Sequence, residues 1–202
     1  DADAPAQFHF LYLFDPHWLY QPSDAHRELG ITRHHDLGVL REELATLTPT
    51  ERDELERVYA DDVERVDRAI GHLCAELKRR GLWDSSSIVL FADHGEYLGE
   101  TTWDGDAWVG HTVDLSDTLM RVPLWVHAPN VKPGVVTEPV SLIDLGATVL
   151  DVAGLPAELG HGRSLLKGPL RDTLYMHVDF EPALLRADSQ RKRALMWGVV
   201  DR

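Results

Sequence analysis

The sequence predicts an α/β fold, a mainly parallel sheet with helices on both faces. Two observations support this prediction. Apolar runs rich in β-branched and aromatic residues alternate along the chain with amphipathic helical patterns. The runs are also apolar on both faces, which is typical of strands covered by helices on each side. The 202 residues contain no internal repeat, low-complexity segment or linker, so we expect one domain or a piece of one.

The first part of the chain predicts a strand, a loop and a short helix. The aromatic run from Phe8 to Phe14 predicts a buried strand, and Asp15-Pro16-His17 ends it because proline cannot continue a central ladder. Turn-forming residues over 20–35 predict a loop. Apolar residues at helical spacing predict a short amphipathic helix from Leu37 to Leu47.

A long helix is the strongest local prediction. Thr48-Pro49-Thr50-Glu51 is a capping box with proline in the first turn. An apolar stripe follows, and Arg79-Arg80-Gly81 supplies the cations and the glycine that commonly end a helix. Cys74 lies on the stripe and is expected to be a buried small hydrophobic residue. Asp67, beside the stripe, is expected to be a buried hydrogen-bond partner.

The rest of the chain predicts four strands, one helix and one long loop. Each strand is a largely apolar run, and glycine and proline stop the helix. The strands are Ser87–Ala92, Val122–Ala128, Thr173–Phe180 and Leu195–Val200, the helix is Ser141–Ala153, and the glycine-dotted loop is Tyr97–Gly110.

Charge and cysteine content exclude several classes of protein. The 34 acidic and 20 basic residues give a net charge of −14, which argues against a free-standing binder of nucleic acid or anionic lipid. A single cysteine permits neither an intrachain disulfide nor a cysteine-rich zinc site. No stretch approaches the ~18 apolar residues of a membrane span, and the first residues lack a signal-peptide pattern. The compartment stays open, cytoplasmic or exported.

Histidines and acidic residues stand where predicted strands end. Asp15-Pro16-His17 and Asp93-His94 follow two strands, and His111 lies in the loop after the second. Ligands of open α/β sheets gather at the carboxyl ends of strands. Gly95 gives the backbone freedom to turn Asp93 and His94 toward one point, where oxygen and nitrogen donors suit a divalent ion. At least one or two further ligands, which we expect to be carboxylates, must come from elsewhere.

Other polar and aromatic residues receive less specific roles. Glu96 and Glu100 are expected to be solvated loop acids. Tyr97, Trp103 and Trp108 either line the mouth of a site or anchor the loop. Five further histidines match no metal spacing and are assigned to loops or strand surfaces: His34, His35, His127, His161 and His177.

Several segments resemble the sulfatase family of the alkaline phosphatase superfamily. They are Tyr59 to Glu100, with Ile-Val-Leu-Phe-Ala-Asp-His-Gly-Glu, Leu115 to Pro129, with Arg-Val-Pro-Leu-Trp-Val-His-Ala-Pro, and Val140 to Leu165, with Gly-Arg-Ser-Leu. Asp15-Pro16-His17-Trp18 is similar to the family's strand-end histidine motif, and the match runs in order from Phe8 to Leu165. The resemblance implies an alkaline-phosphatase-like α/β fold and cleavage of sulfate or related phosphate esters.

The resemblance also implies roles for single residues. Asp93 and His94 match the family's metal ligands, and His17 matches a histidine that contacts the sulfate or phosphate of the substrate. His111 matches a position that binds the same oxyanion or helps the leaving group depart. We therefore expect a small anionic ester as substrate and one divalent ion, Ca²⁺ first, with Mn²⁺, Mg²⁺ or Zn²⁺ as alternatives.

One element of the family pattern is missing from this sequence. The nucleophile motif Cys/Ser-x-Pro-x-Arg does not occur, and Cys74 stands in His-Leu-Cys-Ala-Glu instead. We expect residues 1–202 to be the C-terminal portion of a sulfatase-type catalytic domain, without the nucleophile-bearing half and inactive in isolation. Two alternatives stay open. One is a phosphodiesterase, phosphonate monoester hydrolase or phosphoethanolamine-transferase-like enzyme, and the other is an inactive module that associates with a partner or with itself.

Overall fold

A computed structural model describes residues 6–17, 20, 48–102, 105, 107–111, 114–157, 159–180 and 194–201. The chain forms two compact units, residues 1–75 and 76–202. Among the described helices, none combines the length and the apolar character that a bilayer span requires. The predicted loop 20–35, apart from Tyr20, and the predicted helix Leu37–Leu47 lie outside the described residues, as do His34, His35 and Trp103.

Helix α3, Pro49–Arg79, begins and ends as the sequence predicts. At its start the Thr48 N–H donates to Glu51 Oε2 at 2.7 Å, and the Glu51 N–H donates back to Thr48 Oγ1 at 3.3 Å, which is the reciprocal capping box. At its end Gly81 adopts a φ of 68°, and the Leu82 N–H reaches the Leu77 carbonyl at 2.9 Å. This left-handed glycine closes the helix with a Schellman motif.

The buried acid on α3 is Asp62, and the prediction for Asp67 was wrong. Leu55, Val58 and Asp62 recur at helical spacing on the buried side of the helix, whereas Asp67 is exposed. Asp62 forms an ion pair with Arg65, one turn along the same helix. Cys74 is half-buried rather than fully buried.

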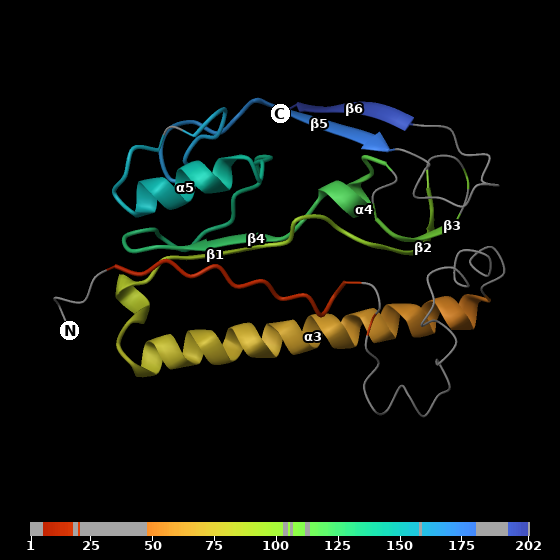
Figure 1. The fold of residues 1–202 in the computed structure, drawn as a ribbon, viewed down its shortest axis with the longest axis horizontal. Helices are drawn as coiled ribbons and strands as arrows, with labels where there is room; N and C mark the ends of the chain where they lie inside the picture. The colour runs from red at the N-terminus through yellow and green to blue at the C-terminus, as the bar shows by residue number, and fades with distance from the viewer. Residues whose placement is uncertain are drawn as a thin grey trace. The chain divides into compact units, whose positions relative to one another are not determined.

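Residues 8–14 do not form the predicted buried strand. They run as an extended segment without a ladder partner among the described residues, and their side chains are exposed, Phe8 by 73 % (Figure 1). The aromatic pattern suits the inside of a sheet, but a strand also needs neighbours that accept its backbone hydrogen bonds. A turn follows, in which the His17 N–H donates to the Phe14 carbonyl at 3.0 Å.

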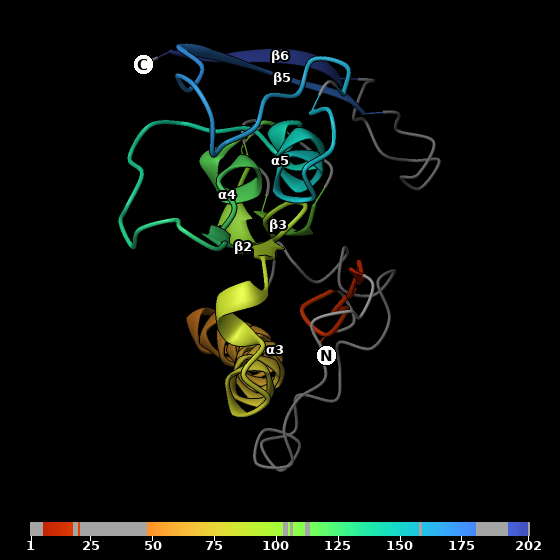
Figure 2. The same ribbon diagram turned by 90° about the vertical axis from the view of Figure 1, so that its left-hand side faces the viewer.

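The second unit contains three two-stranded sheets, all antiparallel. Strand β1, Ile88–Phe91, pairs with β4, Leu124–His127; β2, Tyr97–Thr101, pairs with β3, Ala107–Gly110; and β5, Thr173–Phe180, pairs with β6, Ala194–Asp201. The short helices are η3, Trp83–Ser85, α4, Asp117–Met120, and α5, Asp144–Val152. Figures 1 and 2 show α4 and α5 between the β1–β4 pair and the β5–β6 hairpin.

The α/β class is confirmed, and the parallel pairing is not found among the described strands. A parallel pair needs two strands joined by a crossover such as a helix. Residues 8–14, which precede α3 and β1, join no ladder, and β5, which follows α5, pairs with β6 instead of β4. The four strands predicted after α3 are present as β1, β4, β5 and β6.

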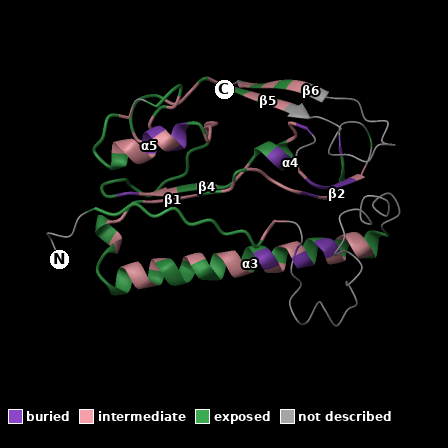
Figure 3. Ribbon diagram, viewed as in Figure 1, coloured by how far each residue is buried: buried purple, intermediate pink, exposed green. Residues whose placement is uncertain are grey.

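The predicted loop Tyr97–Gly110 contains a hairpin instead. Gly99, with a φ of 106°, lies where the β2–β3 register shifts, so one glycine of the supposed loop forms a bulge within a strand. Tyr97 and Trp108 are buried together with Leu119 of α4, and Val178 of β5 packs against them. The two aromatic side chains therefore anchor the core. A further group of buried positions lies on α5, at Asp144, Leu145, Ala147 and Thr148 (Figure 3).

Helix α5 holds the loop that follows it through hydrogen bonds to the loop backbone. Asp144, 2 % exposed, accepts the Arg163 N–H at 2.8 Å and pairs with Nε and Nη2 of Arg171, the nearer, Nη2, at 2.7 Å. Buried Thr148 accepts the Leu165 N–H at 2.9 Å through its hydroxyl. Burial would raise the pKa of Asp144, but Arg171 and the Arg163 N–H outweigh it and hold this pKa below its usual value.

The Asp144–Arg171 pair predicts a pH-dependent stability. Replacing Arg171 with Met leaves a buried carboxylate without its cation, and we expect a loss of about 2 to 3 kcal/mol at pH 7, reduced by the partial exposure of Arg171. Because the folded-state pKa is lowered, the pair stabilises above the unfolded pKa of about 4 and loses this effect as pH falls through the folded value. Denaturant unfolding between pH 7 and 3 should therefore show the two proteins converging.

The matched control is Arg79→Met, which removes an exposed ion pair with Glu76. Solvent screens this pair, so we expect little change at any pH. An Arg171→Met chain as stable as the unsubstituted chain at pH 7 would contradict the proposed role of the buried pair.

Candidate active site: a histidine and glutamate cluster

The turn after β1 is fixed by a close approach of two backbones at Gly95. Its N–H donates to the Leu119 carbonyl in α4 at 2.8 Å, and a Cβ at this position would lie 1.8 Å from the Thr118 carbonyl oxygen. Gly95 does not adopt the left-handed conformation. The glycine is therefore required for space beside α4 rather than for an unusual φ.

The register of the β2–β3 hairpin places Glu96 opposite His111. Tyr97 pairs with Gly110, so Glu96 and His111 occupy the next positions at the open end of the hairpin. Side chains at opposite positions of an antiparallel pair lie on the same face and within contact distance. Gly110 adopts a φ of 103°, a backbone conformation that residues with a side chain rarely adopt. The chain changes direction at this glycine, immediately before His111.

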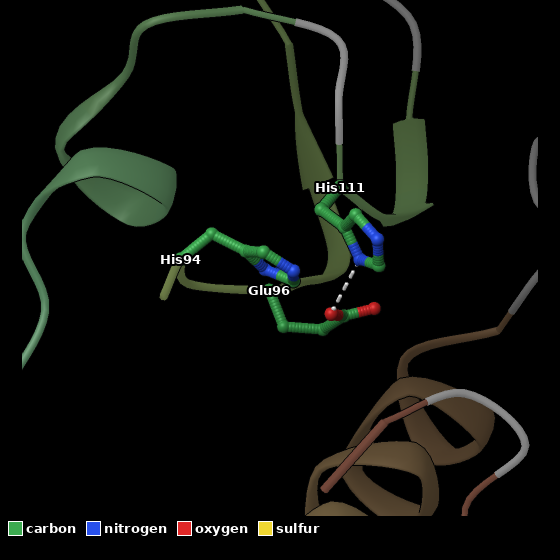
Figure 4. Close-up of side chains that lie close together, drawn as sticks. All are labelled: His94, Glu96 and His111. Atoms are coloured by element: carbon green, nitrogen blue, oxygen red, sulfur yellow. Dashed lines mark hydrogen bonds and ion pairs between the residues drawn. The ribbon is translucent and has the colours of Figure 1, made fainter. Parts of the chain in front are cut away.

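Three side chains meet at this position: His94, Glu96 and His111 (Figure 4). His111 Nδ1 lies 3.0 Å from Glu96 Oε2, and the His94 and His111 ring centroids are 3.9 Å apart. One possible ligand atom from each residue lies within 4.8 Å of the others. The Glu96 side chain is 5 % exposed and that of His111 is 22 % exposed, so the carboxylate is the best shielded member.

Hydrogen bonds fix the two imidazoles differently. His94 Nδ1 lies 2.8 Å from the Gly95 carbonyl, an acceptor, so this nitrogen carries the proton and Nε2 offers the lone pair. A histidine that binds a metal ion commonly donates its other N–H to a carbonyl in this way. At His111 the hydrogen bond to Glu96 raises the pKa of the imidazole, partial burial opposes it, and the charge of Asp93 adds a further increase.

The predicted site residues are only partly brought together. His94 and His111 share the cluster, whereas Asp93 lies beside it with an exposed carboxylate whose Oδ1 is 3.8 Å from His94 Nε2. His17 belongs to the first unit, where its ring stacks on Phe14 with centroids 4.3 Å apart. Of the other histidines, His127 stacks on Trp83 with centroids 4.2 Å apart.

Glu96 is the cluster member that the sequence interpretation missed. We expected a solvated loop acid, but its side chain is almost fully buried. Glu100, which received the same prediction, is exposed. The usable signal was the alternation around Tyr97: if this aromatic residue faces a core, its neighbours face the opposite side of the strand together.

The donor set of the cluster fits a divalent ion. Two imidazoles and a carboxylate suit Mn²⁺ or Zn²⁺, whereas Ca²⁺ and Mg²⁺ prefer oxygen ligands. Two chemical uses are compatible with the distances. Either all three side chains surround one ion, or His94 binds the ion beside a hydrogen-bonded pair of Glu96 and His111.

Comparisons with known proteins find matches to the part of the chain that contains this cluster. The family model described as Sulfatase matches residues 4–155. Choline-sulfatase from Rhizobium meliloti is 30 % identical over 102 residues, 50 % of this chain and 19 % of that protein. The chain thus spans about a fifth of the length of this curated relative.

Two solved structures are similar in fold. The phosphonate monoester hydrolase SpPMH from Silicibacter pomeroyi has a TM-score of 0.59 and 29 % identity, over 88 % of this chain and 35 % of that chain. BT4656, solved with its substrate D-glucosamine-2-N,6-O-disulfate, has a TM-score of 0.52 and 20 % identity, over 91 % of this chain and 46 % of that chain. Both agree with the predicted alkaline-phosphatase-like fold.

The close approach at Gly95 makes a steric prediction. In Gly95→Ala the added methyl group would clash with the Thr118 carbonyl oxygen, so α4 and the turn after β1 must move apart. We expect a loss of stability of about 1 to 3 kcal/mol in thermal or denaturant unfolding. The amide resonances of His94 and Leu119 should shift at the same time.

Gly71→Ala is the matched control, because a Cβ there meets nothing within 4 Å. Gly71 lies inside α3, where alanine is the better helix former, so this change should stabilise the chain slightly, by up to about 1 kcal/mol. If both alanine variants had the same stability, the steric role of Gly95 would be refuted.

Proposed function

This chain belongs to the sulfatase family, and from that membership we propose that the protein is a metal-dependent hydrolase of sulfate esters. The observation that supports the proposal is the cluster of His94, Glu96 and His111, which lies in the turn after β1 and at the open end of the β2–β3 hairpin, within the matched residues. Imidazole and carboxylate groups in one place supply both metal ligands and a proton donor.

We propose that His94 and Asp93 hold the ion. His94 Nε2 is the nitrogen left for a metal by the hydrogen bond from Nδ1, and Asp93 Oδ1 lies 3.8 Å from it, a separation that two ligands of one ion can have. A bound divalent ion would stabilise the negative charge that develops on the ester oxygens. The imidazole ligand favours Mn²⁺ or Zn²⁺ over the Ca²⁺ expected at first.

The remaining residues act on the ester itself. His111 supplies a proton to the leaving oxygen as the sulfur–oxygen bond breaks, and the hydrogen bond to Glu96 favours this role because it raises the pKa of the imidazole. By the family resemblance, His17 contacts an oxygen of the substrate's sulfate, which would spread charge in the transition state. We assign no nucleophile among the residues of this chain.

A second candidate activity is hydrolysis of phosphonate monoesters or phosphodiesters. The similarity to the phosphonate monoester hydrolase SpPMH, at 29 % identity, favours this candidate. Sulfate and phosphonate monoesters present tetrahedral centres with anionic oxygens, so the same imidazoles and ion serve both. Comparing kcat/KM on 4-nitrophenyl sulfate and on a 4-nitrophenyl phosphonate decides between them.

The proposal predicts the effect of His94→Ala in the full-length protein. Loss of a metal ligand should lower kcat/KM on the preferred ester by at least about 100-fold and reduce the bound Mn²⁺ measured after dialysis. Removing the ion from the unsubstituted protein with EDTA should have the same effect, reversed by adding Mn²⁺.

His161→Ala provides the control, because His161 is an exposed histidine outside the cluster. We expect its activity and metal content to stay unchanged. Full activity of both His94→Ala and Asp93→Ala would exclude the proposed site.

A further inference from the structure

The Glu96 side chain is almost fully buried, so its carboxylate needs a hydrogen-bond partner, and the register of the β2–β3 hairpin places His111 beside it. Tyr97 and Gly110 are opposite in the hairpin, and this register sets Glu96 against His111. The Tyr97 side chain points to the core with Trp108 and Leu119, and Glu96, one residue earlier, points to the other face. The relative position of Glu96 and His111 is therefore fixed by the same register that buries Tyr97 and Trp108.

We propose that Glu96 is a positioning residue for His111: its carboxylate holds the imidazole through Nδ1 and assigns proton exchange with the ester to Nε2. The inference rests on the proposed function and deepens it. Glu96 Oε2 accepts from His111 Nδ1 at 3.0 Å, so the neutral ring keeps its proton on Nδ1. Without a partner, the free imidazole exchanges between both tautomers.

Burial of the carboxylate makes this hydrogen bond a strong restraint on the ring. A carboxylate with 5 % of its side chain exposed is poorly solvated, and an N–H donor at hydrogen-bond distance compensates for the lost water. The ring of His94 packs against the other side of the cluster, with ring centroids 3.9 Å apart. The hydrogen bond to Glu96 and the ring contact with His94 both restrain the imidazole of His111.

A positioning role differs from metal ligation by Glu96. In the first case the carboxylate acts through His111, and metal binding depends on His94 and Asp93. In the second case the carboxylate binds the ion directly, and the ion is lost with it. Groups that orient histidines in this manner commonly change activity by about 10-fold to 100-fold when removed.

The test compares Glu96→Gln with Glu100→Gln, an exposed acid on β2. In the chain labelled with ¹⁵N histidine, at a pH where the ring is neutral, the unsubstituted protein should show the Nδ1–H tautomer of His111, and Glu96→Gln should shift the ring toward a mixture of tautomers. In the full-length protein, Glu96→Gln should lower kcat by about 10-fold to 100-fold with KM nearly unchanged. Glu100→Gln should alter neither measurement.

Several outcomes would overturn the proposal. Unchanged His111 nitrogen shifts in Glu96→Gln would show that Glu96 does not set the tautomer. A loss of bound Mn²⁺ as large as in His94→Ala would make Glu96 a ligand instead. If Glu96→Gln does not fold, Glu96→Asp takes its place. This variant should keep the Nδ1–H tautomer of His111 but weaken the hydrogen bond. An unaltered kcat of Glu96→Asp would count against the positioning role.

The two proposals fail separately. Control of the His111 tautomer by Glu96, in a full-length protein inactive on sulfate and phosphonate esters, would leave the positioning role and remove the proposed function. An active protein whose tautomer and kcat do not respond to Glu96→Gln would leave the function and remove the positioning role.

Discussion

The absence of a side chain at residue 95 is the constraint on which the site depends. A turn and a helix meet there at backbone contact distance, with the Gly95 N–H bonded to the Leu119 carbonyl. The Leu119 side chain belongs to the core with Tyr97 and Trp108. The turn that carries His94 is therefore attached to the core through backbone atoms, and its position does not rely on the His94 side chain.

One register of the β2–β3 hairpin determines both which side chains are buried in the core and which side chains meet in the cluster. Strand residues alternate between faces, so Tyr97 enters the core while Glu96 joins the cluster. A slip of one residue would exchange the two faces and separate Glu96 from His111 at once. Stability and site geometry thus depend on the same register, since the register that buries two aromatic rings also pairs the carboxylate with the imidazole.

The sequence predicted the elements that depend on local signals. The capping box, the glycine end of α3 and the exact bounds of β5 follow from residues close together in the chain. The misses needed tertiary information. Residues 8–14 have a strand pattern but no described ladder partner, Asp62 rather than Asp67 faces the interior, and burial of Glu96 follows from pairing across the hairpin. His94 was singled out because a strand end is a local feature, and His111 because it lies in the loop that follows and matches a family position; their contact depends on α4 and on the register.

The anchoring of the loop after α5 has a consequence for how this region can vary among related sequences. Asp144 and Thr148 bind the N–H groups of Arg163 and Leu165, which every residue except proline possesses. The side chains of Arg163 and Leu165 can therefore change without loss of these two hydrogen bonds, whereas the number of residues cannot, because one insertion would offset both N–H groups from their acceptors. Divergence here should proceed by substitution, with length and the exclusion of proline as the conserved properties.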